Sequence, residues 1–220
     1  MLMMKKLLHY GANIVEIAIS LYLYSILQLF YFYPKRIQLP EKSVVIALIT
    51  VIFLSFMFWM YKHQLKYGND WNFNQEPHWS AQRLVITVIG FILITLLGTA
   101  MTIIVGHGSI STNQEALDQI SKQSGNMFKI MVAFIAPFVE EVIFRGMFFN
   151  TFFTKETRMN KWVGIVVSGF VFAYMHDPHI TRFILIYWVL GCVLAWVYLR
   201  TKDLRYSMLT HILYNSIGLF

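Results

Sequence analysis

The stretch LVITVIGFILITLLGTAMTIIV, residues 84–105, contains no charged side chain, and stretches of this kind decide the fold class. A helix rises 1.5 Å per residue, so roughly 20 apolar residues cross the hydrocarbon layer of a bilayer. Of the 220 residues, 57% are hydrophobic and only 13% are charged, whereas about a quarter of a soluble domain is charged. The sequence therefore predicts an all-α integral membrane protein, a polytopic bundle of transmembrane helices solvated by the lipid bilayer.

Apolar runs recur along the chain and predict about seven spans. Between them lie polar segments that we expect to be loops, among them 106–126 and 62–83. The second of these carries Trp71 and Trp79, which we expect at the level of the lipid headgroups. The predicted spans cover residues 11–33, 43–61, 84–105, 128–153, 162–176, 183–199 and 204–220.

The net charge of +7 arises from basic residues in the short loops between spans. This distribution is typical of cytoplasmic loops beside anionic lipid, and it gives no reason to expect a nucleic acid as partner. The basic loops 154–161 and 200–205 are predicted to be cytoplasmic, and the loops 106–126 and 177–182 to lie outside. The loop 34–42 disagrees, because it carries three basic residues although seven spans place it outside.

Three charges interrupt the predicted fourth span, in PFVEEVIFRGMFF, residues 137–149. A charge at the centre of a bilayer costs about 2.5–3.5 kcal/mol on insertion scales, so unpaired charges are rare there. Glu141 and Arg145 are four residues apart, on one face of a helix, and can form a salt bridge. Glu140 is rotated by about 100° from Glu141 and has no local partner in the sequence, which favours a functional role for it.

Further polar residues survive in later spans. His176 ends the predicted fifth span, and His211 and Asn215 lie four residues apart on one face of the last. Counted from the cytoplasmic ends, Glu140 and His176 both lie about 20 Å deep and the other two about 10–16 Å deep. The depths predict that these four side chains meet within the hydrocarbon layer.

Such a group of side chains can activate water. A carboxylate takes the proton as general base, and histidine or asparagine orients the water or donates to the developing oxyanion. Glu140, His176 and His211 are also a ligand set for a catalytic zinc ion. The sequence has no His-Glu-x-x-His motif, which excludes a zincin, but it leaves zinc and a metal-free, glutamate-activated water both open.

Three motifs together resemble one family. EEVIFR (140–145), FAYMH (172–176) and HILYN (211–215) match Glu-Glu-x-x-x-Arg, Phe-x-x-x-His and His-x-x-x-Asn/Asp, in order. This pattern is similar to that of the CAAX protease and bacteriocin-processing membrane proteins, also called the Abi or CPBP family. The resemblance divides the chain into N-terminal helices, 1–126, and a peptidase core, 127–220.

The resemblance implies an intramembrane endopeptidase in which Glu140 is the base and His176 its partner. His211 and Asn215 would complete the site, while Glu141, Arg145 and Phe172 would support it. The family's substrates are prenylated C-terminal tails or small bacteriocin-type peptides, and the short, basic chain resembles the bacterial members, which implies a bacterial plasma membrane. The chief alternative is a non-catalytic immunity or scaffold protein of the same fold. A proton-coupled transporter is disfavoured because the spans show no inverted repeat.

Overall fold

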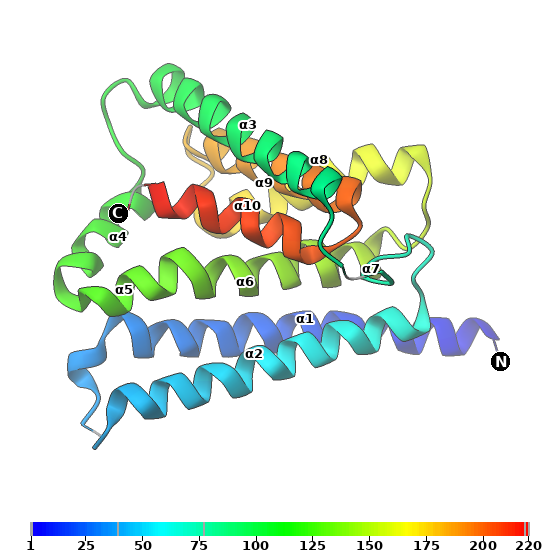
Figure 1. Cartoon of the computed structure of the whole chain (residues 1–220), viewed down its shortest axis with the longest axis horizontal. Coiled ribbons are helices and arrows are strands. Elements are labelled where there is room, and N and C mark those ends of the chain that lie inside the picture. Colours follow the sequence, from blue (N-terminus) through cyan, green and yellow to red (C-terminus); the bar gives the residue numbers. More distant parts are fainter. Residues whose placement is uncertain (1, 39, 77, 218, 220) are drawn as a thin grey trace. The chain divides into compact units, whose positions relative to one another are not determined.

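The computed structural model describes residues 2–38, 40–76, 78–217 and 219, with the side chains of all of these except 2, 3, 5 and 6. Within this part of the chain all regular structure is helical, so the predicted all-α class is confirmed (Figure 1). The chain forms two compact units, Met1–Asn69 with Ile120–Thr154 and Asp70–Gln119 with Lys155–Phe220. These units follow the packing, whereas the division at 126/127 follows the sequence motifs and stays a prediction.

Helices occur at each of the seven predicted spans. Four of the helices described are long and apolar enough to cross a membrane, at Leu7–Phe32, Lys42–Tyr67, Ala81–Gly106 and Ile184–Thr201. The other predicted spans correspond to shorter or more polar helical segments. In chain order the elements are α1 (Leu2–Phe32), η1 (Pro34–Arg36), α2 (Lys42–Tyr67), α3 (Ala81–Gly106), α4 (Thr112–Ser124), α5 (Asn126–Ile130), η2 (Met131–Ile135), α6 (Ala136–Glu141), η3 (Val142–Met147), α7 (Phe148–Phe152), α8 (Arg158–His176), α9 (Ile184–Thr201) and α10 (Leu204–Ile217).

In the first unit, α1 and α2 form an antiparallel hairpin (Figure 1). Near its closed end the hydroxyl groups of Tyr31 and Thr50 are hydrogen-bonded at 2.8 Å. Near its open end Gln64 Nε2 donates to the Glu16 carboxylate at 2.8 Å, and His63 lies 3.5 Å from the same carboxylate. Glu16, a charge inside the first predicted span, is therefore held by the neighbouring helix.

The hairpin contains the loop 34–42, whose three basic residues disagree with the outside location that seven spans predict. The closed end carries Lys35, Arg36 and Lys42. The open end combines Lys5 and Lys6 of α1 with Lys62 and Lys66 of α2. The basic residues at the open end thus outnumber those at the closed end by four to three. This balance favours a cytoplasmic open end, and the orientation of the loops stays a prediction.

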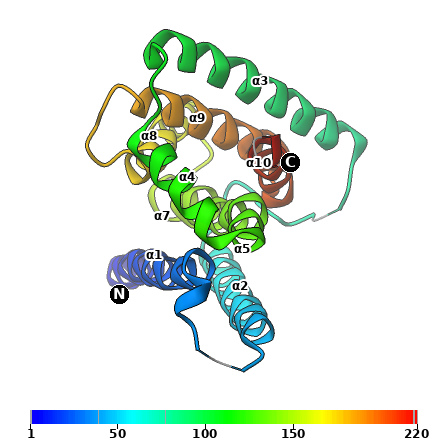
Figure 2. The same cartoon turned by 90° about the vertical axis from the view of Figure 1, so that its left-hand side faces the viewer.

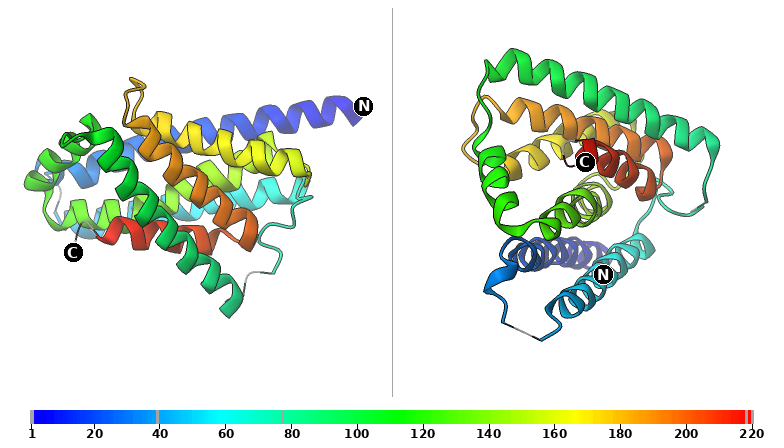
Figure 3. Two further views of the ribbon diagram at one scale, coloured as in Figure 1. Left: turned by 90° about the horizontal axis from the view of Figure 1, so that it is seen from above. Right: turned by 60° about the vertical axis from the view of Figure 1, so that its left-hand side comes forward.

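The second unit is built on α9. Helix α8 packs closely against it at two glycines: a Cβ atom on Gly191 would lie 2.8 Å from the Cα atom of Gly169. Helix α3 lies beside both α9 and α10, as the element contacts and the further views show (Figures 2 and 3). Since helical glycines allow the backbones to approach without a side chain between them, α8 and α9 can dock tightly despite their apolar, otherwise non-directional surfaces.

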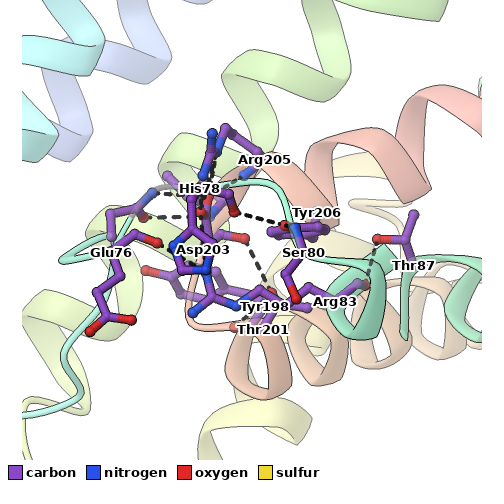
Figure 4. A network of polar contacts seen from close by, with 12 residues as sticks. Glu76, His78, Ser80, Arg83, Thr87, Tyr198, Thr201, Asp203, Arg205 and Tyr206 are labelled. Atoms are coloured by element: carbon purple, nitrogen blue, oxygen red, sulfur yellow. Dashed lines mark hydrogen bonds and ion pairs between the residues drawn. The ribbon is translucent and has the colours of Figure 1, made fainter. Parts of the chain in front are cut away.

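A buried carboxylate fastens the turn between α9 and α10 (Figure 4). Asp203 is 2.7 Å from Arg205 Nη2 and 3.8 Å from Arg83 Nη1, and it accepts a hydrogen bond from Asn74 Nδ2 at 3.1 Å. Tyr206 donates to the carbonyl oxygen of His78 at 2.9 Å. These bonds tie the irregular segment 70–80 to the start of α10.

Three expectations for the polar segments need correction. Residues 62–67 continue α2, and 112–124 form α4 within the segment expected to be a loop. The less exposed residues of α4 recur every three or four positions, at Asn113, Leu117, Ile120 and Ser124, and this helical periodicity explains why the segment is not a loop. Trp71 is 1% exposed, packs among side chains of the second unit and so does not face headgroups, whereas Trp79 is exposed. Residues 218 and 220 of the last predicted span lie outside the described residues.

Candidate active site

The predicted ion pair between Glu141 and Arg145 is present. Arg145 Nε lies 3.4 Å from Glu141 Oε2, and both side chains are fully buried. Burying a charge without a partner costs several kcal/mol, so each of the two charges makes the other tolerable in the interior. The pair leaves the adjacent carboxylate, Glu140, for another role.

Glu140 is held by a residue that the sequence did not indicate. The Tyr24 hydroxyl donates to Glu140 Oε1 at 2.8 Å, across 116 residues of sequence. Both side chains are buried, with exposed fractions of 8% for Tyr24 and 7% for Glu140. The expectation that Glu140 has no local partner holds only along its own helix. Tyrosine is frequent in the apolar spans of this chain, so no pattern in the sequence distinguished Tyr24.

The two glutamates stand on a short α-helical segment between two wider turns. In η2 and η3 the backbone forms π-type turns, in which the N–H groups of Ala136 and Phe148 donate to the carbonyl oxygens of Met131 and Ile143, five residues earlier. Proline lacks an N–H group and its ring crowds the carbonyl four residues before it, so the wide turn before Pro137 relieves that clash. Such turns are frequent at functional sites, and they change the side-chain directions that an ideal helix would predict.

On the second unit, a backbone hydrogen bond orients the ring of His176. Its Nδ1 atom lies 2.9 Å from the carbonyl oxygen of Phe172, one turn earlier in α8. A carbonyl can only accept, so Nδ1 carries the proton in this bond. In the neutral ring Nε2 then carries the lone pair, which is the form that accepts a proton or binds a metal.

His211 lies near the same phenylalanine. The ring of Phe172 is 4.3 Å from that of His176 and 5.8 Å from that of His211, measured between centroids. Phe172 and His211 are buried, and Asn215 is half-buried one turn after His211 in α10. The predicted supporting role of Phe172 thus has a physical basis, because its ring contacts both imidazoles.

A second tyrosine, Tyr187, contacts His176 from the next helix in the chain. The ring of Tyr187, in α9, stacks on that of His176 with 5.1 Å between centroids. The Tyr187 hydroxyl is hydrogen-bonded to Ser111 Oγ at 2.8 Å and accepts from Asn113 Nδ2 at 3.2 Å. Tyr187 therefore links His176 to the start of α4, a contact that the sequence also did not indicate.

The predicted residues thus fall into two groups, one in each unit. The first unit holds Glu140, Glu141 and Arg145. The second holds Phe172, His176 and His211, with Asn215 on the same helix as His211. That the four proposed catalytic side chains act together stays a prediction from their motifs and depths.

The side chains present meet a part of what a zinc site requires. A catalytic zinc site takes three protein ligands and an open position. His176 offers an Nε2 lone pair, and the second unit supplies His211 as another nitrogen ligand. However, the described residues contain no group of three or more His, Cys, Asp or Glu side chains arranged to hold a metal ion. Zinc binding by Glu140, His176 and His211 stays a prediction from the sequence.

The region that contains the three motifs is similar to known proteins. Residues 123–217 match a family model described as type II CAAX prenyl endopeptidase, Rce1-like, and this match contains all three motifs. The chain is 29% identical over 136 residues to the membrane-embedded CAAX protease MroQ of Staphylococcus aureus (59% of this chain, 54% of that protein). It is 27% identical over 135 residues to the UPF0177 protein YvdC of Lactococcus lactis (60% and 50%). It is 26% identical over 111 residues to the putative membrane peptidase YdiL of Bacillus subtilis (50% and 43%).

The chain spans about half the length of these curated relatives. No solved structure matches it. The resemblance drawn from the three motifs is confirmed, since an independent family model covers the same region of the chain and two relatives carry protease or peptidase names. Residues 123–217 are therefore similar to the Rce1-like type II CAAX prenyl endopeptidases, and the similarity includes all three motifs.

Proposed function

We propose that this protein is an intramembrane endopeptidase that hydrolyses a peptide bond in a small peptide or a membrane-anchored tail. The observation that carries the proposal is that two adjacent buried glutamates have different partners. Glu141 is held in an ion pair with Arg145, whereas Glu140 accepts a hydrogen bond from the neutral hydroxyl of Tyr24. The ion pair gives Glu141 a structural role, and Glu140, which accepts from a neutral hydroxyl, is the candidate for the general base.

The reaction follows from general base catalysis. Glu140 removes a proton from water, and the water oxygen forms a bond to the carbonyl carbon of the substrate. His176 orients the water through Nε2, while His211 and Asn215 donate to the oxyanion that develops on the carbonyl oxygen. The C–N bond then breaks, and the proton on Glu140 passes to the leaving amine. In this scheme no residue is consumed, and both products leave with balanced charges.

The zinc alternative uses the same residues differently. Glu140, His176 and His211 would hold the ion, and the ion would supply Lewis-acid activation of water. Metal analysis of the purified protein distinguishes the two schemes. About one zinc per chain, lost in both His176→Ala and His211→Ala, favours the metal scheme, whereas activity that survives chelation favours the glutamate scheme.

Two substrate classes fit the family resemblance. One is a prenylated C-terminal tail, as in the description of the family model, and the other is a bacteriocin-type peptide. The relatives named above come from bacteria, which supports the proposal that this protein lies in a bacterial plasma membrane. A peptide panel with and without a prenyl group separates the two classes by the rate of cleavage.

Glu140→Gln tests the function. Glutamine keeps the shape and still accepts from Tyr24, but it cannot serve as the base, so we expect cleavage in liposomes to fall by about 10²–10⁴-fold with the protein folded. The matched control is Glu16→Gln, a second glutamate within an apolar helix, held by Gln64, which should retain wild-type activity. If Glu140→Gln retains full activity, the catalytic proposal fails and a non-catalytic immunity or scaffold role replaces it.

A further inference from the structure

Helix α1 lies outside the region that matches the family model, yet it contacts the proposed base. Tyr24 donates its hydroxyl proton to Glu140 Oε1 at 2.8 Å. The match to the family model begins at residue 123, so neither the family motif nor its spacing includes this tyrosine. The contact lies wholly within the first unit of the chain.

The packing of α1 fixes the direction of Tyr24. Ser20, Tyr24, Leu27 and Tyr31 are spaced by three or four residues, so they form one stripe along the helix, and all four are buried. Ser20 contacts the sulfur atom of Met147, two residues after Arg145, at 3.8 Å. Tyr22 is 68% exposed on another face of the same helix. Tyr24 thus lies on the buried face of α1, between other buried residues of the same stripe.

Position matters for a general base. A carboxylate can rotate and can present either oxygen, and only a part of these orientations lies within hydrogen-bond reach of an attacking water. A third group that fixes the base therefore increases the fraction of productive complexes. The Tyr24 hydroxyl occupies one lone pair of Oε1 and so restricts the rotation of the carboxylate.

We propose that Tyr24 is a positioning residue that orients the Glu140 carboxylate for catalysis. The inference rests on the proposed function, because it assigns Glu140 the role of base. It adds a requirement that the motifs do not contain: the first helix of the chain is part of the catalytic machinery. Tyr24 touches neither water nor substrate in this account and acts through Glu140 alone.

The test is Tyr24→Phe, with Tyr22→Phe as its matched control on the same helix. Phenylalanine keeps the buried ring and removes only the hydroxyl. A hydrogen bond to a charged group contributes about 1.5–3 kcal/mol, so kcat for peptide cleavage should fall by about 10- to 100-fold. KM and the midpoint of thermal unfolding in detergent should change little, because substrate contacts and core packing are retained. Tyr22→Phe should leave kcat, KM and the midpoint unchanged.

Two further changes test the positioning role of Tyr24 even if Tyr24→Phe does not fold. In Glu140→Asp the carboxylate is one methylene shorter and no longer reaches the hydroxyl, so adding Tyr24→Phe to it should lower kcat by less than about twofold. If Tyr24→Phe is not recovered folded, 3-fluorotyrosine at position 24 keeps the shape and alters only the acidity of the hydroxyl. A change in kcat for fluorotyrosine at 24 and none at 22 supports the inference, and equal values at both positions overturn it.

Failure of this inference is distinct from failure of the proposed function. If Tyr24→Phe equals Tyr22→Phe in kcat while Glu140→Gln is inactive, Tyr24 has no positioning role and Glu140 is still the base. If Glu140→Gln is as active as the wild type, the proposed function itself fails, whatever Tyr24→Phe does.

Discussion

In the first unit three charged side chains lie within residues 140–145, whereas in the second unit the polar groups of interest are two imidazoles on separate helices. Each carboxylate of the first unit has its own partner: Glu141 forms an ion pair with the guanidinium group of Arg145, and Glu140 accepts a hydrogen bond from the phenol of Tyr24. The imidazoles meet aromatic rings, and His176 also meets a backbone carbonyl.

Desolvation explains the difference. A buried carboxylate is expensive unless it is paired, because water no longer solvates its charge. A neutral imidazole has little charge to solvate, so it needs one hydrogen bond and a surface that holds its plane. The helical geometry differs in the same way, since the charged segment has wide turns on both sides and α8 is a regular helix.

The comparison predicts that removing a charge partner in the first unit damages folding. Arg145→Ala leaves the Glu141 carboxylate buried without its guanidinium, which should lower stability by about 3–5 kcal/mol. The measurement is the amount of folded protein and the thermal midpoint in detergent. The exchange Glu141→Arg with Arg145→Glu should restore part of the loss.

One result would place Arg145 elsewhere. If Arg145→Ala keeps its abundance and thermal midpoint but loses cleavage, the ion pair is not a structural clamp and Arg145 belongs to the active site.

Asp203, a buried carboxylate outside the proposed catalytic residues, tests whether a buried charge depends on its partners as Glu141 is expected to do. Asp203 accepts from Arg205 and Asn74, so Asp203→Asn should lower the free energy of unfolding by about 1.5–3 kcal/mol through weakened charged hydrogen bonds. Glu156→Gln is the control, because the pair of Glu156 with Lys202 is exposed and such pairs contribute about 0–1 kcal/mol. Denaturant titration of both variants measures the difference, and equal losses would contradict the role of burial.

The smallest effect is expected at Tyr187, where a change to Leu removes the ring contact with His176 and the hydroxyl that binds Ser111 and Asn113. Stacked aromatic pairs contribute about 0.5–1.5 kcal/mol, so Tyr187→Leu should lower kcat by about 3- to 10-fold through a less ordered His176. Tyr187→Phe keeps the ring and should lose less. The control Tyr174→Leu changes an exposed residue on α8 and should leave kcat unchanged. Equal losses for Tyr187→Phe and Tyr187→Leu would assign the effect to the hydroxyl and not to the stacked ring.

The sequence predicted much of the fold because its signals were long. Apolar runs of about 20 residues correspond to helices in every case, and the i, i+4 spacing of Glu141 and Arg145 predicted their ion pair. Helix α4 was missed because its inner face is short and partly polar. The wide turns around Glu140 were missed because Pro137 changes the backbone hydrogen bonds without changing the hydrophobic pattern.

The candidate site was predictable only where residues lie in motifs. Glu140, His176 and His211 stand at fixed spacings that a single sequence displays. Tyr24 and Tyr187 do not, because their contacts join residues 116 and 11 positions apart through packing of apolar helices. In the sequence they are two tyrosines among twelve, and only the helix faces distinguish them.

The central claim is that Glu140 and His176 act on one water molecule, and a double-mutant cycle tests it most directly. Single-turnover cleavage is measured in liposomes for Glu140→Gln, His176→Ala and the double variant. Residues that act as a unit show strongly non-additive losses, so the double variant should be no slower than the slower single variant, within about threefold. If the two losses instead multiply, the residues act independently, and the account of a single base–imidazole pair is contradicted.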